Sequence, residues 1–254
     1  MQAQPHLGPN ERLDEVNENL SLIQRKNALA FGTDAFLLSA FCRANVRGRI
    51  ADFGCGTGII ALLLAARRRY TKIFGVEVQT VFAELAARNV ALNGQNNTVT
   101  ILARDVRELS PADFGGELDA VVTNPPYMRV ETGFSSPYDE KQIARHEVCG
   151  DIDAFTASAT RCLRYGGTFY CVWRPDRLAS LFAALHASAL SPKRMVFVHD
   201  SPEKSPAMVL LEARRGGAEG LSILPPLFLH DESGANRPLT PRAQRIYDTG
   251  SFDS

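Results

Sequence analysis

The sequence predicts an α/β fold built on a doubly wound sheet of seven strands, mostly parallel and with one antiparallel strand. Short apolar runs alternate with amphipathic segments of helical period along most of the chain, as in parallel sheets covered by helices on both faces. The first apolar run leads into a glycine-rich turn at residues 54–58, where folds of this kind bind ligands. The last two apolar runs have no helical segment between them, so we expect a hairpin that brings the antiparallel strand into the sheet.

The element boundaries follow from the residues that interrupt each run. The Asn-Gly pair at 93–94 and the Gly-Gly pair at 166–167 are typical helix ends, and Pro175 is typical of a helix start. The two prolines at 125–126 lack a backbone N–H, so the strand before them must stop. We therefore expect helices at residues 59–69, 81–94, 153–167 and 175–188. We expect strands at residues 49–53, 72–77, 99–105, 118–124, 168–173, 193–199 and 207–215.

Length and composition fit a single domain over residues 1–254. With 254 residues, of which 45% are hydrophobic, the chain is long enough for one well-buried core. We divide this domain into an N-terminal segment at residues 1–48, an α/β core at 49–215 and a C-terminal tail at 216–254.

Charge and cysteine content limit the partners and the compartment. Lys plus Arg and Asp plus Glu each number 28, so a globally basic surface is absent and any RNA contact must use a local basic patch. The N-terminus lacks the apolar core of a signal peptide, and the longest apolar run, IIALLLAA from Ile59, is too short to cross a bilayer. The five cysteines form no C-x-x-C pair, which indicates reduced thiols. We expect a cytoplasmic protein without a membrane anchor or a bound metal.

The turn ADFGCGTG at residues 51–58 joins the first strand to its helix. Gly54, Gly56 and Gly58 let the backbone turn tightly and let a ligand approach the main chain closely. Their spacing is G-x-G-x-G and differs from the G-x-G-x-x-G of dinucleotide-binding enzymes. A plain strand-to-helix turn is the alternative interpretation.

An acidic residue lies at the end of each of the first three strands. Glu77 is placed where a carboxylate can accept hydrogen bonds from both hydroxyls of a ribose, and Asp105 where it can accept from an adenine amine. For each, the alternative is a carboxylate that caps the next helix. Together with Asp52 and the glycine turn, the three acids favour a ligand that contains a ribose and an adenine.

Four ordered motifs resemble those of class I S-adenosylmethionine-dependent methyltransferases, which have a Rossmann-like fold: DFGCGTG, GVE, ARD and TNPPY. The resemblance implies S-adenosylmethionine as cofactor, with the glycine turn against its methionine portion, Glu77 on the ribose and Asp105 on the adenine amine. The residues expected to bind the cofactor are Thr33, Asp34, Asp52, Gly54, Cys55, Gly56, Gly58, Glu77, Asp105, Val106 and Asn124.

The motif Asn124-Pro125-Pro126-Tyr127 is the candidate catalytic segment. An adenine or amide amine is a poor nucleophile because its lone pair is delocalised. The Asn124 side-chain oxygen and the Pro125 carbonyl can each accept one N–H of such an amine, which favours its more tetrahedral, nucleophilic form. Pro126 adds rigidity, and Tyr127 offers a flat face for stacking. The alternative is a strand-ending Pro-Pro turn. The motif resembles the signature of enzymes that methylate adenine, guanine exocyclic amines or glutamine amides.

Further stretches resemble the bacterial tRNA (adenine-N6) methyltransferases that modify valine tRNA next to its anticodon. They are residues 11–41, 144–155 and 225–234, whereas the tail after Gly234 shows only part of that family's pattern. The resemblance implies that the stretch GTDAFLL covers the cofactor. Helix capping by Thr33 and Asp34 is an equal alternative.

The resemblance implies tRNA as partner, and nothing in the sequence indicates an obligate protein partner. Arg129, Arg145 and Lys204 are candidate RNA contacts, and for Arg145 a capping or surface role is equally compatible with the sequence. Two other enzyme classes share the NPPY signature: the glutamine methyltransferases of release factors, and the methyltransferases of ribosomal-RNA guanine or DNA adenine. An inactive, cofactor-binding RNA-associated module is the non-enzyme alternative.

Overall fold

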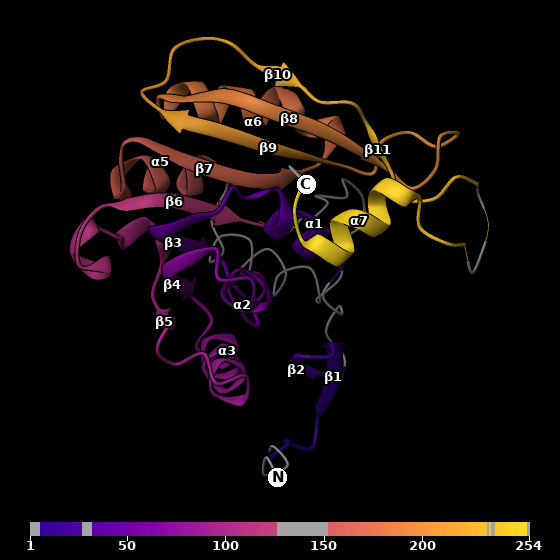
Figure 1. The fold of residues 1–254 in the computed structure, drawn as a ribbon. Helices are drawn as coiled ribbons and strands as arrows, with labels where there is room; N and C mark the ends of the chain where they lie inside the picture. The colour runs from indigo at the N-terminus through magenta and orange to yellow at the C-terminus, as the bar shows by residue number, and fades with distance from the viewer. Residues whose placement is uncertain (1–5, 27–31, 126–151, 233, 235–236, 253–254) are drawn as a thin grey trace, which may run out of the picture.

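The computed structural model describes residues 6–26, 32–125, 152–232, 234 and 237–252. Within them, a central sheet has the strand order β10-β8-β9-β7-β6-β3-β4-β5, and β11 also pairs with β8 (Figure 1). Strand β9 runs antiparallel to both of its neighbours, whereas the other pairs are parallel. The predicted doubly wound fold class and its hairpin are confirmed.

The main strands follow the predicted order along the chain. They are β3 (Asn45–Phe53), β4 (Tyr70–Glu77), β5 (Val99–Ala103), β6 (Leu118–Thr123), β7 (Leu163–Trp173), β8 (Leu190–His199) and β9 (Met208–Arg215). Two short strands from the tail, β10 (Ser222–Ile223) and β11 (Leu227–Phe228), extend the sheet beyond the seven strands that were predicted.

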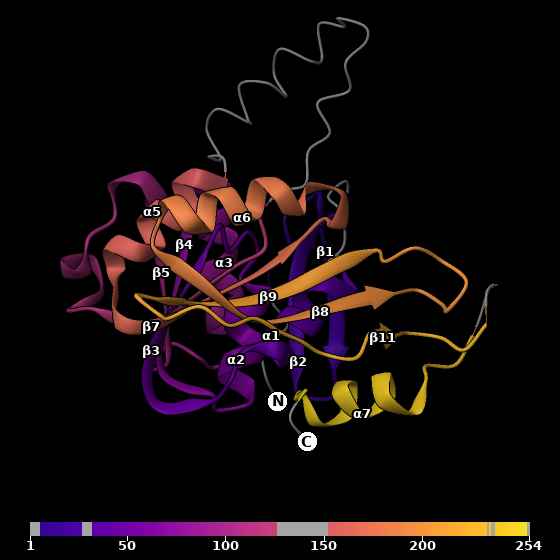
Figure 2. The ribbon, with the colours of Figure 1, turned by 90° about the horizontal axis from the view of Figure 1, so that it is seen from above.

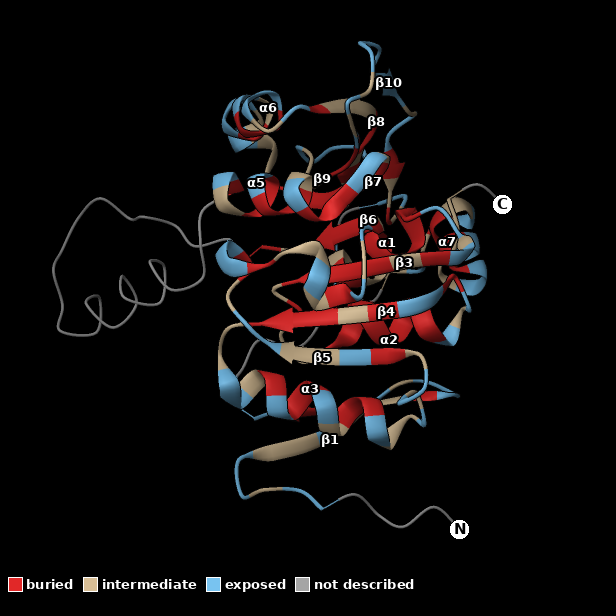
Figure 3. Cartoon of the chain, turned by 90° about the vertical axis from the view of Figure 1, so that its left-hand side faces the viewer, coloured by how far each residue is buried: buried red, intermediate tan, exposed pale blue. Residues whose placement is uncertain are grey.

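Helices cover both faces of this sheet (Figure 2). One apolar cluster joins the sheet to α1 (Thr33–Phe41), α2 (Ile59–Ala66) and α7 (Pro241–Thr249), and includes Val90 of α3 (Thr80–Leu92). A second cluster joins the other face to α5 (Ile152–Cys162) and α6 (Leu178–Ala187). Short 3-10 helices lie at Val106–Glu108 (η1), Pro111–Phe114 (η2) and Pro175–Arg177 (η3). Burial is most complete in the carboxyl-terminal halves of β3, β4 and β7, as expected where both faces of the sheet are covered (Figure 3).

The helix predicted at residues 153–167 is too long at its C-terminal end. Helix α5 ends at Cys162, and the chain continues directly into β7. The pairing of β6 with β7 skips from Leu118 opposite Leu163 to Ala120 opposite Thr168, so the residues between form an irregularity in the strand. Gly166 has a φ of +75° within it. The glycine pair therefore serves a bulge rather than a helix end.

An N-terminal hairpin of β1 (Glu11–Asn17) and β2 (Leu20–Arg25) forms a separate antiparallel sheet, which was not predicted. It docks on α3 through two asparagine side chains. Asn89 accepts a hydrogen bond from Ile23 N at 2.7 Å and donates to Ile23 O at 3.1 Å. Asn93 likewise accepts a hydrogen bond from Ser21 N at 3.0 Å and donates one to Ser21 O at 2.7 Å. Two side-chain amides thus satisfy the backbone groups of an otherwise unpaired strand edge.

Membrane and metal features are absent from the part of the chain that the structure describes. None of the helices in these residues is long and apolar enough to span a bilayer. The same residues hold no group of three or more His, Cys, Asp or Glu side chains that could bind a metal ion. Cys42, Cys55, Cys162 and Cys171 are buried free thiols, and Cys149 lies outside the described residues.

Candidate active site

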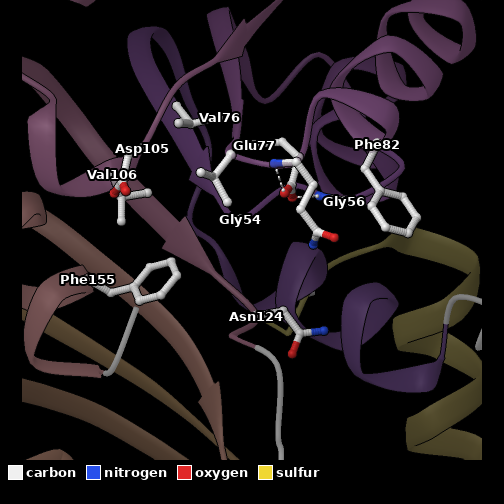
Figure 4. A pocket seen from close by; sticks show the side chains of 11 residues that line it. Gly54, Gly56, Val76, Glu77, Phe82, Asp105, Val106, Asn124 and Phe155 are labelled. Atoms are coloured by element: carbon white, nitrogen blue, oxygen red, sulfur yellow. Dashed lines mark hydrogen bonds between the residues drawn. The ribbon is translucent and has the colours of Figure 1, made fainter. Parts of the chain in front are cut away.

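The carboxyl ends of β3, β4, β5 and β6 meet around one cavity, the position at which open α/β sheets bind ligands. Side chains from α3 and α5 close its sides (Figure 4). The lining residues are Gly54, Gly56, Val76, Glu77, Val78, Gln79, Phe82, Asp105, Val106, Asn124 and Phe155.

The glycine turn presents bare backbone to this cavity. The amides of Gly54 and Cys55 both donate to Val76 O at 2.9 Å, which ties the turn to β4. Gly56 has a φ of +55°, and apart from its two chain neighbours no described residue has an atom within 4 Å of the place where its Cβ would be. Gly58 has a φ of +85° at the start of α2, where a Cβ would approach the Ala86 Cβ to 3.3 Å. Gly56 therefore leaves open space for a ligand, whereas Gly58 allows close packing of α2 on α3.

Glu77 is a buried carboxylate fixed by two backbone amides. Its Oε2 accepts from Gly56 N at 3.0 Å, and its Oε1 accepts from Gln79 N at 2.9 Å. Each oxygen of an ionised carboxylate can accept more than one hydrogen bond, so both retain capacity toward the cavity. The hydrogen bonds from the two backbone amides agree with the alternative that Glu77 caps the adjoining backbone. Its position at the cavity agrees with a contact to a ribose.

Asp105 is the N-cap of η1 and lines the same cavity. Its Oδ1 accepts from Arg107 N at 2.9 Å, and the Arg107 guanidinium forms an ion pair with the carboxylate. The hydrogen bond that the Arg107 side chain donates to the carboxylate holds the pKa of Asp105 below its ordinary value. Asp105 is therefore an ionised acceptor at neutral pH.

Asp52 lies at the end of β3 and is 1% exposed. Neither of its carboxylate oxygens has a hydrogen-bond partner of regular geometry among the described residues. Burial, followed by the nearby charge of Glu77, raises the pKa of Asp52 to about 8. A backbone hydrogen bond from Ala61 acts in the opposite direction, and Asp52 is not among the residues that line the cavity.

Asn124 follows β6 and reaches the rim of the cavity. Its Nδ2 donates to Asp34 Oδ2 at 2.9 Å, and its Oδ1 is buried without a partner among the described residues. A carboxylate oxygen that accepts from the amide identifies its NH₂ end, so Asp34 assigns Nδ2, and Oδ1 is left without a partner among the described residues. Pro125 is buried beside it.

The structure places the other predicted site residues as follows. Thr33 and Asp34 begin α1 and do not line this cavity, and Cys55 and Gly58 lie in the turn behind it. Lys204, in the loop between β8 and β9, is ion-paired with Asp200. Pro126, Tyr127, Arg129 and Arg145 lie outside the described residues.

The sequence did not single out five of the lining residues: Val76, Val78, Gln79, Phe82 and Phe155. Apolar residues at such positions have the same pattern as core residues, so only the fold distinguishes them. Phe155 comes from α5, on the opposite face from α3, and its ring lies close to Gly54.

A second cavity adjoins the first through the Asp34–Asn124 pair. It is lined by Asp34, Trp173, Arg174, Pro175, Asp176, Ser205, Pro206, Ala207 and Met208.

A family model described as the methyltransferase small domain matches residues 25–186. The chain belongs to this family. It is therefore a class I methyltransferase, and the predicted cofactor S-adenosylmethionine is confirmed as that of its class.

Curated relatives match most of this methyltransferase. A Porphyromonas gingivalis protein named tRNA1(Val) (adenine(37)-N6)-methyltransferase is 28% identical over 233 residues, which cover 89% of this chain and 91% of the relative. A Phocaeicola vulgatus protein of the same name is 30% identical over 184 residues, covering 72% and 76% of the two chains. The crystal structure of a predicted O-methyltransferase, protein Atu636 from Agrobacterium tumefaciens, superposes with a TM-score of 0.68 at 22% identity. It covers 86% of this chain and 97% of that chain, and it supports the fold.

The described residues fit this cofactor. The free backbone at Gly56 suits the close approach of a ligand, and Glu77 and Asp105 offer acceptors for hydroxyl and amine donors. When bound, S-adenosylmethionine supplies a methyl group on a positively charged sulfur.

Proposed function

We propose that this methyltransferase modifies the exocyclic N6 amine of an adenosine in tRNA, next to the anticodon of valine tRNA. The observation that carries the proposal is the buried Oδ1 of Asn124 at the rim of the cofactor cavity, which has no hydrogen-bond partner among the described residues. A planar amine needs such an acceptor. The names of relatives that span most of the chain support adenine N6 in valine tRNA as the acceptor.

In this proposal the chain acts mainly by orienting the acceptor. Asn124 Oδ1 accepts one N–H of the amine and the Pro125 carbonyl accepts the other, which draws the nitrogen lone pair out of conjugation. The nitrogen forms its bond to the methyl carbon as the bond from that carbon to sulfur breaks. The surplus proton then leaves to water, so positioning contributes more than a strong base. Tyr127 provides the stacking face for the base.

The cofactor contacts remain part of the proposal. Glu77 and Asp105 hold the ribose and the adenine amine of S-adenosylmethionine, and the glycine turn lies against its methionine portion. The N-terminal segment at 1–48 covers the cofactor, the core at 49–215 binds it, and the tail at 216–254 completes the domain.

RNA is bound through a local basic patch, because the chain as a whole is neutral. Arg129, Arg145 and Lys204 are its proposed members. Since its substrate is tRNA, we place the protein in the cytoplasm, acting without an obligate protein partner.

Mass spectrometry of tRNA, ribosomal RNA and release factors from cells with and without the gene tests this function. We expect loss of N6-methyladenosine from valine tRNA alone. Loss of a methylated release-factor glutamine, or of methylguanosine in ribosomal RNA, would instead support one of the rival enzymes. An unchanged set of modifications would favour an inactive cofactor-binding module.

A further inference from the structure

The orientation of the Asn124 amide depends on a residue far away in the sequence. Asp34 Oδ2 accepts from Asn124 Nδ2 at 2.9 Å, across 90 residues of chain. Without this acceptor the amide could rotate by half a turn and present its NH₂ group to the incoming amine. Two sets of N–H donors would then face each other, and the nitrogen would not be activated.

Asp34 is itself held in place at the start of α1. Its Oδ1 accepts from Ala35 N at 2.8 Å, within the same first turn. Phe36, one residue further, stacks on Tyr247 of α7 with ring centroids 4.3 Å apart and an interplanar angle of 11°. The Tyr247 side chain is also hydrogen-bonded to Thr33. Helix α7 therefore contacts α1 on both sides of Asp34 in the sequence.

The end of the chain is locked to the same region. Arg69, which is 8% exposed, donates to Cys42 O and to Gly250 O, directly after α1 and α7 respectively. Phe252 packs edge-on against Phe41, with ring centroids 5.4 Å apart. Figure 1 shows α7 lying beside α1. The tail thus fixes α1 at its first and last turns.

We propose that Asp34 is a positioning residue, which presents Asn124 Oδ1 to the acceptor amine, and that α7 holds it there through α1. This inference rests on the proposed function for the role of Asn124. It gives Asp34 a role different from direct cofactor binding, since Asp34 faces the second cavity and Asn124 rather than the cofactor cavity. It also gives the tail a function at the site.

A double-mutant cycle on the single-turnover methylation rate tests the proposal. Asp34→Ala should lower the rate about 10- to 100-fold in the wild-type background and leave it unchanged in the Asn124→Ala background, because the two residues act as a unit. Asp34→Asn keeps an acceptor for Nδ2 and should recover part of the rate. The dissociation constant of S-adenosylmethionine, measured by calorimetry, should change less than about threefold.

Additive rate losses, or a cofactor affinity that falls with the rate, would overturn the proposal and make Asp34 a cofactor ligand. The contribution of α7 is read from Tyr247→Ala, which should lower the rate at unchanged cofactor affinity. The exposed Asp248→Ala on the same helix is the control and should behave as wild type. A wild-type rate in Tyr247→Ala would remove α7 from the account.

The side-chain NH₂ signal of Asn124 in ¹H–¹⁵N spectra provides a readout independent of activity. It is assigned by its loss in Asn124→Ala, and it should shift and exchange faster with solvent in Asp34→Ala. An unchanged signal would show that the pair does not form. If the wild type leaves tRNA unmethylated, the proposed function fails, and the same cycle is then measured on the acceptor that mass spectrometry identifies.

Discussion

At the scale of single residues, the proposed mechanism assigns Asn124 one acceptor that the substrate amine needs as the methyl group is transferred. Asn124→Ala should lower the single-turnover rate by about 10²–10³-fold, the usual effect of losing one preorganised hydrogen-bond partner. Cofactor affinity should change little, because Glu77, Asp105 and the glycine turn remain. The measurement uses unmodified tRNA and labelled cofactor. Methylation at the wild-type rate would show that the Asn-Pro-Pro segment is structural only.

The raised pKa of Asp52 predicts that the stability of the fold depends on pH. Its folded-state pKa, about 8, lies above the ordinary value of 3.8, so the fold favours the protonated acid. This contribution to stability is fully present below about pH 4 and is lost as the pH rises through about 8. Asp52→Asn keeps a neutral side chain at every pH. The Tm of the cofactor-free wild type should therefore fall relative to that of Asp52→Asn between pH 4 and pH 8, and the difference should level off above pH 8. Parallel Tm profiles for the two proteins would contradict the raised pKa.

The location of several candidate site residues was predictable from the sequence. Gly56, Glu77, Asp105 and Asn124 were expected to bind cofactor, and the structure places all four around one cavity. Short stretches of sequence are enough to locate such residues, because strand ends and glycine turns can be recognised from neighbouring residues. The Asp34–Asn124 hydrogen bond was not predictable, because it joins residues 90 positions apart and depends on how α1 sits on the sheet.

At the scale of elements, the N-terminal hairpin depends on Asn89. This side chain is fully buried and pairs with both backbone groups of Ile23 and with Thr57 O. Asn89→Ala leaves these buried groups unpaired, and should lower the free energy of unfolding by roughly 1–3 kcal/mol. Denaturant titration measures the change. Asn89→Asp keeps the acceptor for Ile23 N and loses the donors. A loss below about 0.5 kcal/mol for Asn89→Ala would mean that the hairpin contributes little to stability.

Element boundaries show where the sequence was insufficient. The alternation of strands and helices was predicted correctly because each parallel strand is buried on both faces and each helix on one. Glycine pairs were ambiguous, since Gly166 serves a bulge at the start of β7 whereas Gly94 ends α3. The hairpin β1–β2 escaped prediction because one edge pairs with asparagine side chains of α3 rather than with another strand.

At the scale of the whole molecule, the balance of charge limits how the protein binds RNA. With 28 basic and 28 acidic residues, only a local patch can contact phosphates. The affinity for tRNA should therefore fall with salt concentration along a shallow slope, which reflects few phosphate contacts. Binding titrations over a series of salt concentrations give this slope. A slope that corresponds to ten or more contacts would require an extended basic surface and contradict the local patch.

The most direct test of the central claim is methylation of valine tRNA transcripts by the purified protein, followed by nucleoside mass spectrometry. One transcript carries adenosine next to the anticodon, and the other carries guanosine at that position and is otherwise identical. We predict N6-methyladenosine in the first transcript and no methylated nucleoside in the second. Equal methylation of both transcripts, or of neither while a release-factor glutamine peptide is methylated, would contradict the account.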